Sequence, residues 1–135
     1  MALPHASHLD IINVSPLGEN LANAVSTSLI KTGRLQLLHM VLPAHKDVPY
    51  HSVDEECTVH CLEGVVELVT GAGARQLRAG NLVVLPAKER HALRARTDSA
   101  VLVTLILREG DAGNQGGAGP RTLTGQLPPR DSSPQ

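Results

Sequence analysis

Short apolar runs separated by turn-forming residues make up the middle of the chain, and most of them have the length of a β-strand. Several runs are rich in β-branched residues, and clusters of Gly, Asn, Asp or Ser, such as those at 71–73 and 97–99, separate many of them. This alternation predicts an all-β sandwich or barrel. The runs cover residues 9–14, 24–30, 35–42, 57–62, 65–69, 82–85, 91–95 and 100–107.

Residues 17–32 have a pattern that could also be taken for a helix. The Val-Ser-Thr-Ser centre of this segment and its alternation of apolar and polar positions favour a strand. We therefore expect a strand here, and we expect the chain to contain almost no helix.

The 135 residues are enough for one domain with one core. Residues 109–135 hold six of the 12 glycines and four of the 9 prolines, a composition that cannot bury enough apolar surface to order the chain. We expect a flexible arm at 1–8, one barrel at 9–108 and a disordered tail at 109–135.

Composition excludes several classes of function. The net charge is -1, which argues against binding to nucleic acid or to anionic membranes through bulk charge. Tyr50 is the one aromatic residue, so the stacking platforms that bind single-stranded nucleic acid are absent. The core must therefore consist mainly of Leu, Val, Ile and Ala.

The sequence also bears on the compartment. No apolar run reaches the roughly 18–20 residues that span a bilayer, and no secretory signal is evident at the start. Cys57 and Cys61 are too few for a disulfide scaffold, and on one strand they would lie about 13 Å apart, too far to pair. We expect a cytoplasmic protein with reduced thiols.

Two blocks of the sequence resemble the conserved motifs of the cupin superfamily, whose members are small jelly-roll barrels. The first cupin motif is G-x5-H-x-H-x(3,4)-E-x6-G. In register, this chain has His45, His51, Val53, Cys57 and Gly64 at the motif positions, so the second and last of them keep the usual residue.

The second block follows after 15 residues, a typical cupin gap. Its motif is G-x5-P-x-G-x2-H-x3-N, and this chain has Gly80, Pro86, Lys88, His91 and Ala95 at those positions. Three of the five keep the usual residue. The resemblance therefore implies a single all-β, cupin-type double-stranded β-helix, with turns at the glycines and a strand that ends at Pro86.

Metal-binding cupins hold their ion with two His and one Glu from the first block and one His from the second. Here His51 and His91 remain, whereas Val53 and Cys57 replace the other two ligands. A thiolate from Cys57 would give a two-His, one-Cys set suited to Zn or Cu, and a bulge could instead bring Glu56 to the carboxylate position. The alternatives are a buried, inert Cys57 and a solvated acidic turn. The implied cofactor, if one is bound, is a divalent ion of Zn, Ni, Fe or Cu.

Strand alternation predicts which side chains line the interior near the two histidines. We expect an apolar interior on which two imidazoles converge, with His60 on the opposite face of its strand. His39 could line the interior or be a core histidine with satisfied hydrogen bonds. The predicted lining is His51, Cys57, Val59, Cys61, His91 and Leu93, with Leu35 or His39 from a neighbouring strand.

Three basic residues, Arg90, Arg94 and Arg96, alternate along one run and would share a face if that run is a strand. They form either a patch that binds anions or a partner, or a solvated outer face. We favour the second interpretation.

Three functions agree with these features. The first is a module that binds or senses a small molecule and has lost its metal site. The second is a metal-dependent enzyme, similar to cupin dioxygenases or isomerases, that uses His51, His91 and Cys57 or Glu56. The third is a metal-free enzyme in which His51 or His91 acts as a general base. We also expect a homodimer, because small cupins commonly pair through a sheet and the outer faces of this chain carry apolar residues.

Overall fold

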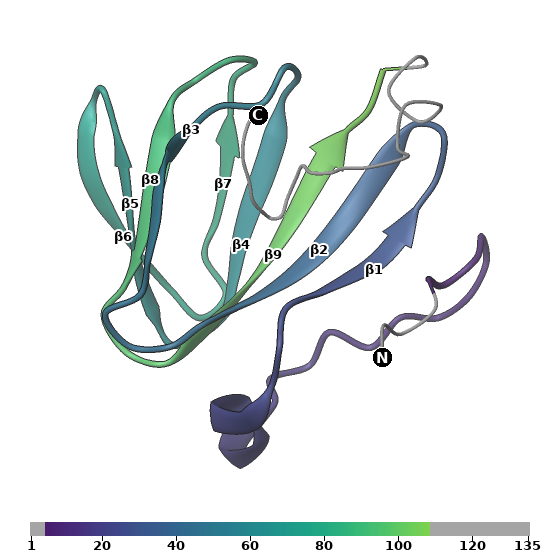
Figure 1. The fold of residues 1–135 in the computed structure, drawn as a ribbon, viewed down its shortest axis with the longest axis horizontal. Helices are drawn as coiled ribbons and strands as arrows, with labels where there is room; N and C mark the ends of the chain where they lie inside the picture. Colours follow the sequence, from purple (N-terminus) through teal and green to yellow (C-terminus); the bar gives the residue numbers. More distant parts are fainter. Residues whose placement is uncertain (1–4, 109–135) are drawn as a thin grey trace.

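Two antiparallel β-sheets face each other and form a jelly-roll barrel (Figure 1). The computed structural model describes residues 5–108, so the predicted tail at 109–135 and the first four residues of the predicted arm lie outside the described residues. The predicted all-β fold is confirmed. The strands are β1 (Thr27–Lys31), β2 (Leu35–Leu42), β3 (Asp47–His51), β4 (Cys57–Glu63), β5 (Val65–Thr70), β6 (Gly73–Arg78), β7 (Leu82–Leu85), β8 (His91–Ala95) and β9 (Ser99–Ile106).

One sheet has the strand order β1-β2-β9-β4-β7, and the other has the order β3-β8-β5-β6. Every neighbouring pair of strands is antiparallel. The sheets meet at the lower end of Figure 1 and separate toward the upper end, where the β3–β4 and β7–β8 loops lie. We call this the upper end of the barrel.

The core lies between the sheets and contains no aromatic side chain. It is built from Leu, Val, Ala and Cys side chains of both sheets, as the composition predicts, and Leu68, Val59, Val66 and Val101 are its largest fully buried members. Alternate residues of β4 belong to this core, because successive side chains of a strand point to opposite faces. The inward residues of β4 are Cys57, Val59 and Cys61.

Two strands, β3 and β6, were not among the predicted apolar runs. Both are edge strands of the four-stranded sheet, and most of their residues are exposed, so their sequences lack a hydrophobic signal. Conversely, the apolar run at 9–14 does not form a strand. Leu9 and Ile11 in that run are fully exposed.

Residues 17–32 contain both a helix and a strand, so the prediction is right for β1 and wrong for the residues before it. A 3-10 helix, η1, covers Gly18–Asn23. The Glu63 carboxylate accepts hydrogen bonds from the backbone N–H groups of Leu17 at 2.7 Å and Gly18 at 3.2 Å. Leu21 of this helix packs with Leu62 and Ala100 on the outer face of the five-stranded sheet. These contacts satisfy the backbone N–H groups at the start of the helix and bury Leu21. Because the contacting residues are distant in the sequence, the local pattern of residues 17–32 does not predict the helix.

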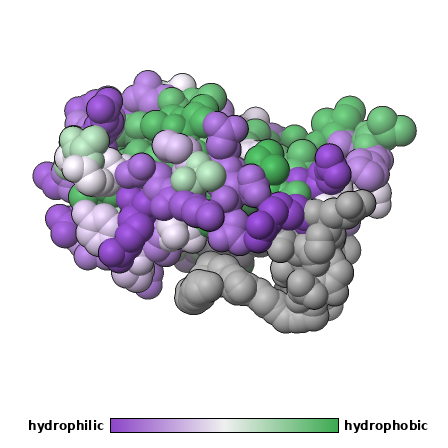
Figure 2. All heavy atoms as spheres, turned by 90° about the horizontal axis from the view of Figure 1, so that it is seen from above, coloured by the Kyte–Doolittle hydropathy of each residue, from purple (hydrophilic) through white to green (hydrophobic). Residues whose placement is uncertain are grey.

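The outer surface combines polar side chains with apolar patches (Figure 2). On the edge strand β7, Leu82 and Val84 are more than half exposed. This is the kind of apolar row that the predicted homodimer would bury, and the dimer stays a prediction. Among the described residues, no helix is long and apolar enough to cross a membrane.

The turn between β4 and β5 yields a prediction about stability. Gly64 has φ +85, and a Cβ built on it would overlap Ser99 Oγ and the carbonyl oxygen of Asp98. Ser99 is fully buried, and its hydroxyl accepts a hydrogen bond from Val65 N–H at 3.1 Å. We expect Gly64→Ala to lower the free energy of unfolding by about 2–4 kcal/mol, because backbone strain and overlap with a buried group act together.

The matched control is Gly80→Ala. Gly80 has φ +91, but a Cβ there would meet no atom within 4 Å, so this variant carries the backbone strain alone, about 1–2 kcal/mol. Urea unfolding of both variants measures the difference. An equal decrease in the free energy of unfolding for the two variants would show that the close approach of Gly64 to Ser99 does not affect stability.

Candidate functional site

Two histidines face each other near the upper end of the barrel. His51 ends β3 and His91 begins β8, and the two residues are directly opposite in the antiparallel pairing of these strands. Opposite residues in such a pair have side chains on the same face. The ring centroids are therefore only 4.3 Å apart, with the ring planes tilted by 57°. The structure thus brings together two residues that come from different sequence blocks.

Backbone carbonyl groups fix the orientation of both rings. Nδ1 of His51 lies 2.9 Å from the carbonyl oxygen of Pro49, and Nδ1 of His91 lies 2.9 Å from that of Glu89. A carbonyl oxygen only accepts hydrogen bonds, so in each ring Nδ1 must carry the proton and donate. In the neutral form of each ring, Nε2 is then the nitrogen that holds the lone pair.

Burial keeps His91 neutral. The side chain is 3% exposed, and this burial, together with the neighbouring His51, lowers the pKa of His91 to about 4, although the hydrogen bond to Glu89 opposes the shift. Burial also raises the pKa of the Cys57 thiol to about 12. At neutral pH this part of the barrel therefore contains an uncharged imidazole and an uncharged thiol.

The other predicted lining residues mostly share the core with this pair. Cys57, Val59, Cys61 and Leu93 are all buried within the same hydrophobic cluster. Val53, which stands at a ligand position of the cupin motif, packs against that cluster from the β3–β4 loop. The interior around the histidines is therefore apolar.

The structure does not bring His39 into this interior. His39 pairs with Leu102 of β9, and Leu102 pairs with His60 of β4. This row lies on the outer face of the sheet, because Val59 and Val103 next to it belong to the core. His60 thus faces outward as predicted, and His39 is buried under other residues of the outer face instead of lining the barrel.

The residues present do not assemble a complete metal site. Within residues 5–108, no group of three or more His, Cys, Asp or Glu side chains is placed to hold a metal ion. Cys57 is a buried thiol that loses its proton reluctantly, and Glu56 is exposed. Glu55 lies 3.7 Å from the guanidinium of Arg108. The predicted metal ligands, His51 and His91 with Cys57 or Glu56, therefore stay a prediction.

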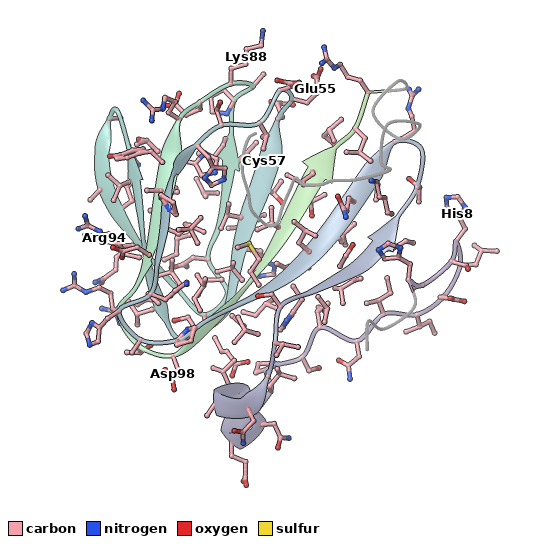
Figure 3. The ribbon with its side chains drawn as sticks, viewed as in Figure 1. His8, Glu55, Cys57, Lys88, Arg94 and Asp98 are labelled. Atoms are coloured by element: carbon pink, nitrogen blue, oxygen red, sulfur yellow. The ribbon has the colours of Figure 1, made fainter. Side chains whose placement is uncertain are left out.

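Two residues at motif glycine positions keep the backbone conformation of glycine. His45 has φ 70 and Lys88 has φ 66, and both are exposed. Lys88 lies on the β7–β8 loop at the upper end of the barrel, at the same end as Glu55 (Figure 3). Its backbone N–H donates to the carbonyl oxygen of Val53 at 2.8 Å, which joins the two loops next to the histidine pair.

Lys88 and Tyr50 are not among the site residues that the sequence predicts. The sequence pattern places Arg90 only in an alternating basic run, yet its Cζ lies 5.5 Å from the centre of the Tyr50 ring. The available signal was a lysine at a position where the cupin motif has glycine. The contact between Arg90 and Tyr50 had no sequence signal, because the two residues lie on separate segments.

The neutral state of His91 predicts how stability depends on pH. The ordinary value of a histidine pKa is 6.5, and the folded value is about 4. Between these two pH values the unfolded chain binds more protons than the folded chain. The free energy of unfolding therefore decreases as the pH falls from 6.5 to 4. We expect a loss on the order of 3 kcal/mol from this residue.

Urea unfolding of the wild type and of His91→Gln between pH 7.5 and 4 isolates this contribution. The difference in free energy of unfolding between wild type and His91→Gln should decrease by that amount toward pH 4. The exposed control His8→Gln should have the same pH dependence of stability as the wild type. A constant difference between wild type and His91→Gln across the range would contradict the burial of a neutral ring.

Comparisons with known proteins agree with this architecture. A conserved protein of unknown function from Streptococcus pyogenes has 20% identity and a TM-score of 0.62, covering 81% of this chain and 96% of that one. A cupin superfamily protein from Desulfitobacterium hafniense has 14% identity and a TM-score of 0.62, covering 73% and 95%. A salicylate 1,2-dioxygenase from Pseudaminobacter salicylatoxidans has 15% identity and a TM-score of 0.55, covering 58% and 25%.

At these identities the similarity establishes the fold alone. No curated protein sequence matches the chain. The family model described as "Cupin domain" matches residues 38–107, which include both histidines and all the strands that position them. The match spans more than half of the chain, and this protein therefore belongs to the cupin domain family.

Proposed function

We propose that this cupin is a small-molecule binding domain whose ligand is recognised by the His51–His91 pair. The observation that carries the proposal is the pair itself: two imidazoles with centroids 4.3 Å apart, each oriented by a backbone carbonyl, next to an apolar core. Binding sites for small molecules combine mostly apolar walls with a few well-placed polar groups.

The tautomers of the two rings define which ligands fit. With Nδ1 donating to a backbone carbonyl, Nε2 of each neutral ring is an acceptor. A ligand with a hydroxyl or N–H donor and an apolar body can satisfy this acceptor while it covers apolar side chains. A ligand that brings only acceptors leaves the Nε2 lone pair of the buried His91 without a donor, which costs about 1–3 kcal/mol.

Proton transfer is a weaker interpretation of the same pair. A general base works best when its pKa is near the pH at which the enzyme operates. The pKa of His91 is lowered to about 4 by burial and by the adjacent His51, so at neutral pH this ring is a poor proton acceptor. Recognition by hydrogen bonding needs no such match, because the neutral ring is the form that accepts.

Binding of phenol and anisole tests the proposal. The two molecules have similar size, but only phenol donates a hydrogen bond. We expect phenol to bind saturably with a dissociation constant in the millimolar range, and anisole to bind at least tenfold more weakly, a difference of about 1.4 kcal/mol. Two-dimensional NMR that correlates the ring nitrogens and carbon-bound protons of histidine would follow the Nε2 signals of His51 and His91.

Two variants complete this test. His51→Phe removes one of the two acceptors and keeps a ring, so it should weaken the preference for phenol. His60→Phe places the same residue on the outer face of β4, where binding should be unaffected. Equal affinity for phenol and anisole in the wild type would refute recognition by these nitrogens.

Metal binding is the second candidate function, and one observation favours it. A metal-ligating histidine usually donates its other ring N–H to a carbonyl or carboxylate, which is how both Nδ1–H groups are held here. The alternative function is then a metal-dependent cupin enzyme, like the dioxygenase among the structural neighbours. Two imidazoles are fewer ligands than such a site needs, since catalytic zinc sites use three protein ligands.

Restoring the motif residues distinguishes the two functions. Val53 packs against the core and Cys57 lies within it, so both positions face the side on which the histidines lie. We expect the wild type to bind Ni²⁺ weakly and Val53→His with Cys57→Glu to bind it at least tenfold more tightly, a gain of about 1.4 kcal/mol or more. The metal-free double variant should be less stable, because it places polar groups among apolar ones.

The control for this titration is Val84→His with Thr58→Glu. Val84 and Thr58 are directly opposite on β7 and β4 and lie on the outer face, so the same two residue types are added away from the histidines. Titration calorimetry compares the three proteins. Tight Ni²⁺ binding by the wild type that Cys57→Ser abolishes would instead support the metal-dependent enzyme.

A further inference from the structure

We propose that Lys88, Arg90 and Tyr50 form an oxyanion-binding site on the rim at the upper end of the barrel, which takes a carboxylate or phosphate group. This site goes beyond the proposed function, because it lies outside the apolar core that holds the histidine pair. Figure 3 shows Lys88 at this end of the molecule, extending away from the sheets.

The site is a depression of about 490 Å³ where three segments of the chain meet. Tyr50 comes from β3, Gly71 from the β5–β6 turn, and Lys88, Glu89 and Arg90 from the loop that precedes β8. A Cβ added at Gly71 would meet no atom within 4 Å, so the glycine side of the depression is open. The opening admits a small ligand without rearrangement of the sheet.

The charges of this depression favour an anion. Its lining contains two cations, Lys88 and Arg90, and one carboxylate, Glu89, so its net charge is positive. In the described part of the chain, no carboxylate lies within ion-pair distance of Lys88 or Arg90. These two cations therefore keep their capacity to bind an external oxyanion.

Other arginines of the barrel differ in this respect. The Arg94 guanidinium lies 3.8 Å from the Asp47 carboxylate and 3.9 Å from that of Glu67. Arg108 lies 2.9 Å from the Asp54 carboxylate and 3.7 Å from that of Glu55. Arg90 thus differs from its neighbour on the same run, Arg94, whose charge is balanced within the chain.

The Arg90 side chain is held in place before any ligand arrives. The Arg90 guanidinium lies over the Tyr50 ring, with Cζ 5.5 Å from the ring centre. This contact uses the face of the guanidinium and leaves N–H groups along its edges for an oxyanion. Little side-chain freedom is then lost on binding, which favours affinity.

The backbone of Lys88 is also constrained. Lys88 has φ 66, a conformation that costs a residue with a Cβ about 1–2 kcal/mol relative to the right-handed region. The hydrogen bond from Lys88 N–H to the Val53 carbonyl oxygen, 2.8 Å long, holds it there. A lysine kept in such a conformation at a rim position points to a use for its side chain.

Titration of the nitrogen-labelled wild type with butanoate and with inorganic phosphate at constant ionic strength tests the proposal. The expected result is saturable shifts of the backbone amide signals of Gly71, Lys88 and Arg90, with a dissociation constant in the millimolar range for at least one anion. Butan-1-ol, which has the same carbon chain without the charge, should produce no such shifts. The two anions distinguish a carboxylate site from a phosphate site.

Lys88→Gly and Arg90→Gln should each weaken binding at least tenfold. Glycine adopts the backbone conformation of Lys88 readily, so Lys88→Gly removes the charge without disturbing the loop, and Arg90→Gln keeps a polar side chain on a similar stem. Arg94→Gln is the control, because it changes the net charge equally on a side chain that is already paired.

Three outcomes would overturn the proposal. These are no saturable shift with either anion, unchanged affinity in both Lys88→Gly and Arg90→Gln, or an equal loss in Arg94→Gln, which would indicate an effect of net charge alone. The phenol test of the histidine pair involves neither cation, so the two proposals can fail separately.

Discussion

Antiparallel pairing between β3 and β8 is the constraint on which the candidate site depends. The register places His51 opposite His91 and Val48 opposite Leu93, so one face of the pair delivers two imidazoles and two apolar side chains toward the core. A shift of the register by one residue would turn these side chains to the solvent face. The irregularity between Val48 and His51 is thus part of the site, because it sets which residue meets His91.

Burial decides the chemical state of the groups that this pairing brings inside. The pKa of His91 is lowered and that of the Cys57 thiol is raised, both mainly by desolvation, so each group is held in its neutral form. A neutral imidazole acceptor within an apolar barrel suits the proposed hydrogen-bonded recognition more than acid–base chemistry. Fixed charge lies on the rim, where Lys88 and Arg90 remain in contact with water.

Several positions of this chain differ from the cupin motif in their side chains but keep the backbone conformation or the orientation that the motif residue would have. His45 and Lys88 retain positive φ angles at positions where the motif has glycine. Each position therefore carries a strained backbone in exchange for a side chain that glycine cannot provide. Val53 and Cys57 show the complementary change, because they keep inward positions while their side chains differ from the His and Glu of the motif.

The sequence by itself determined the fold class and most of the strands. Period-two alternation and β-branched runs place β2, β4, β5, β7, β8 and β9, because buried strands need apolar side chains at alternate positions. Gly64 and Gly80 mark turns with φ +85 and +91, which only glycine adopts without strain. The motif register also predicts that His51 and His91 converge.

Only the tertiary structure decided the remaining features. Edge strands β3 and β6 have little apolar signal, and η1 depends on hydrogen bonds to Glu63, which is distant in the sequence. The face to which His39 points follows from its pairing through Leu102 to His60. The contact between Arg90 and the Tyr50 ring likewise depends on how β3 and the loop before β8 lie in the folded protein. In each case the deciding contact joins segments far apart in the chain, and the pattern of one segment holds no information about the partner that it meets.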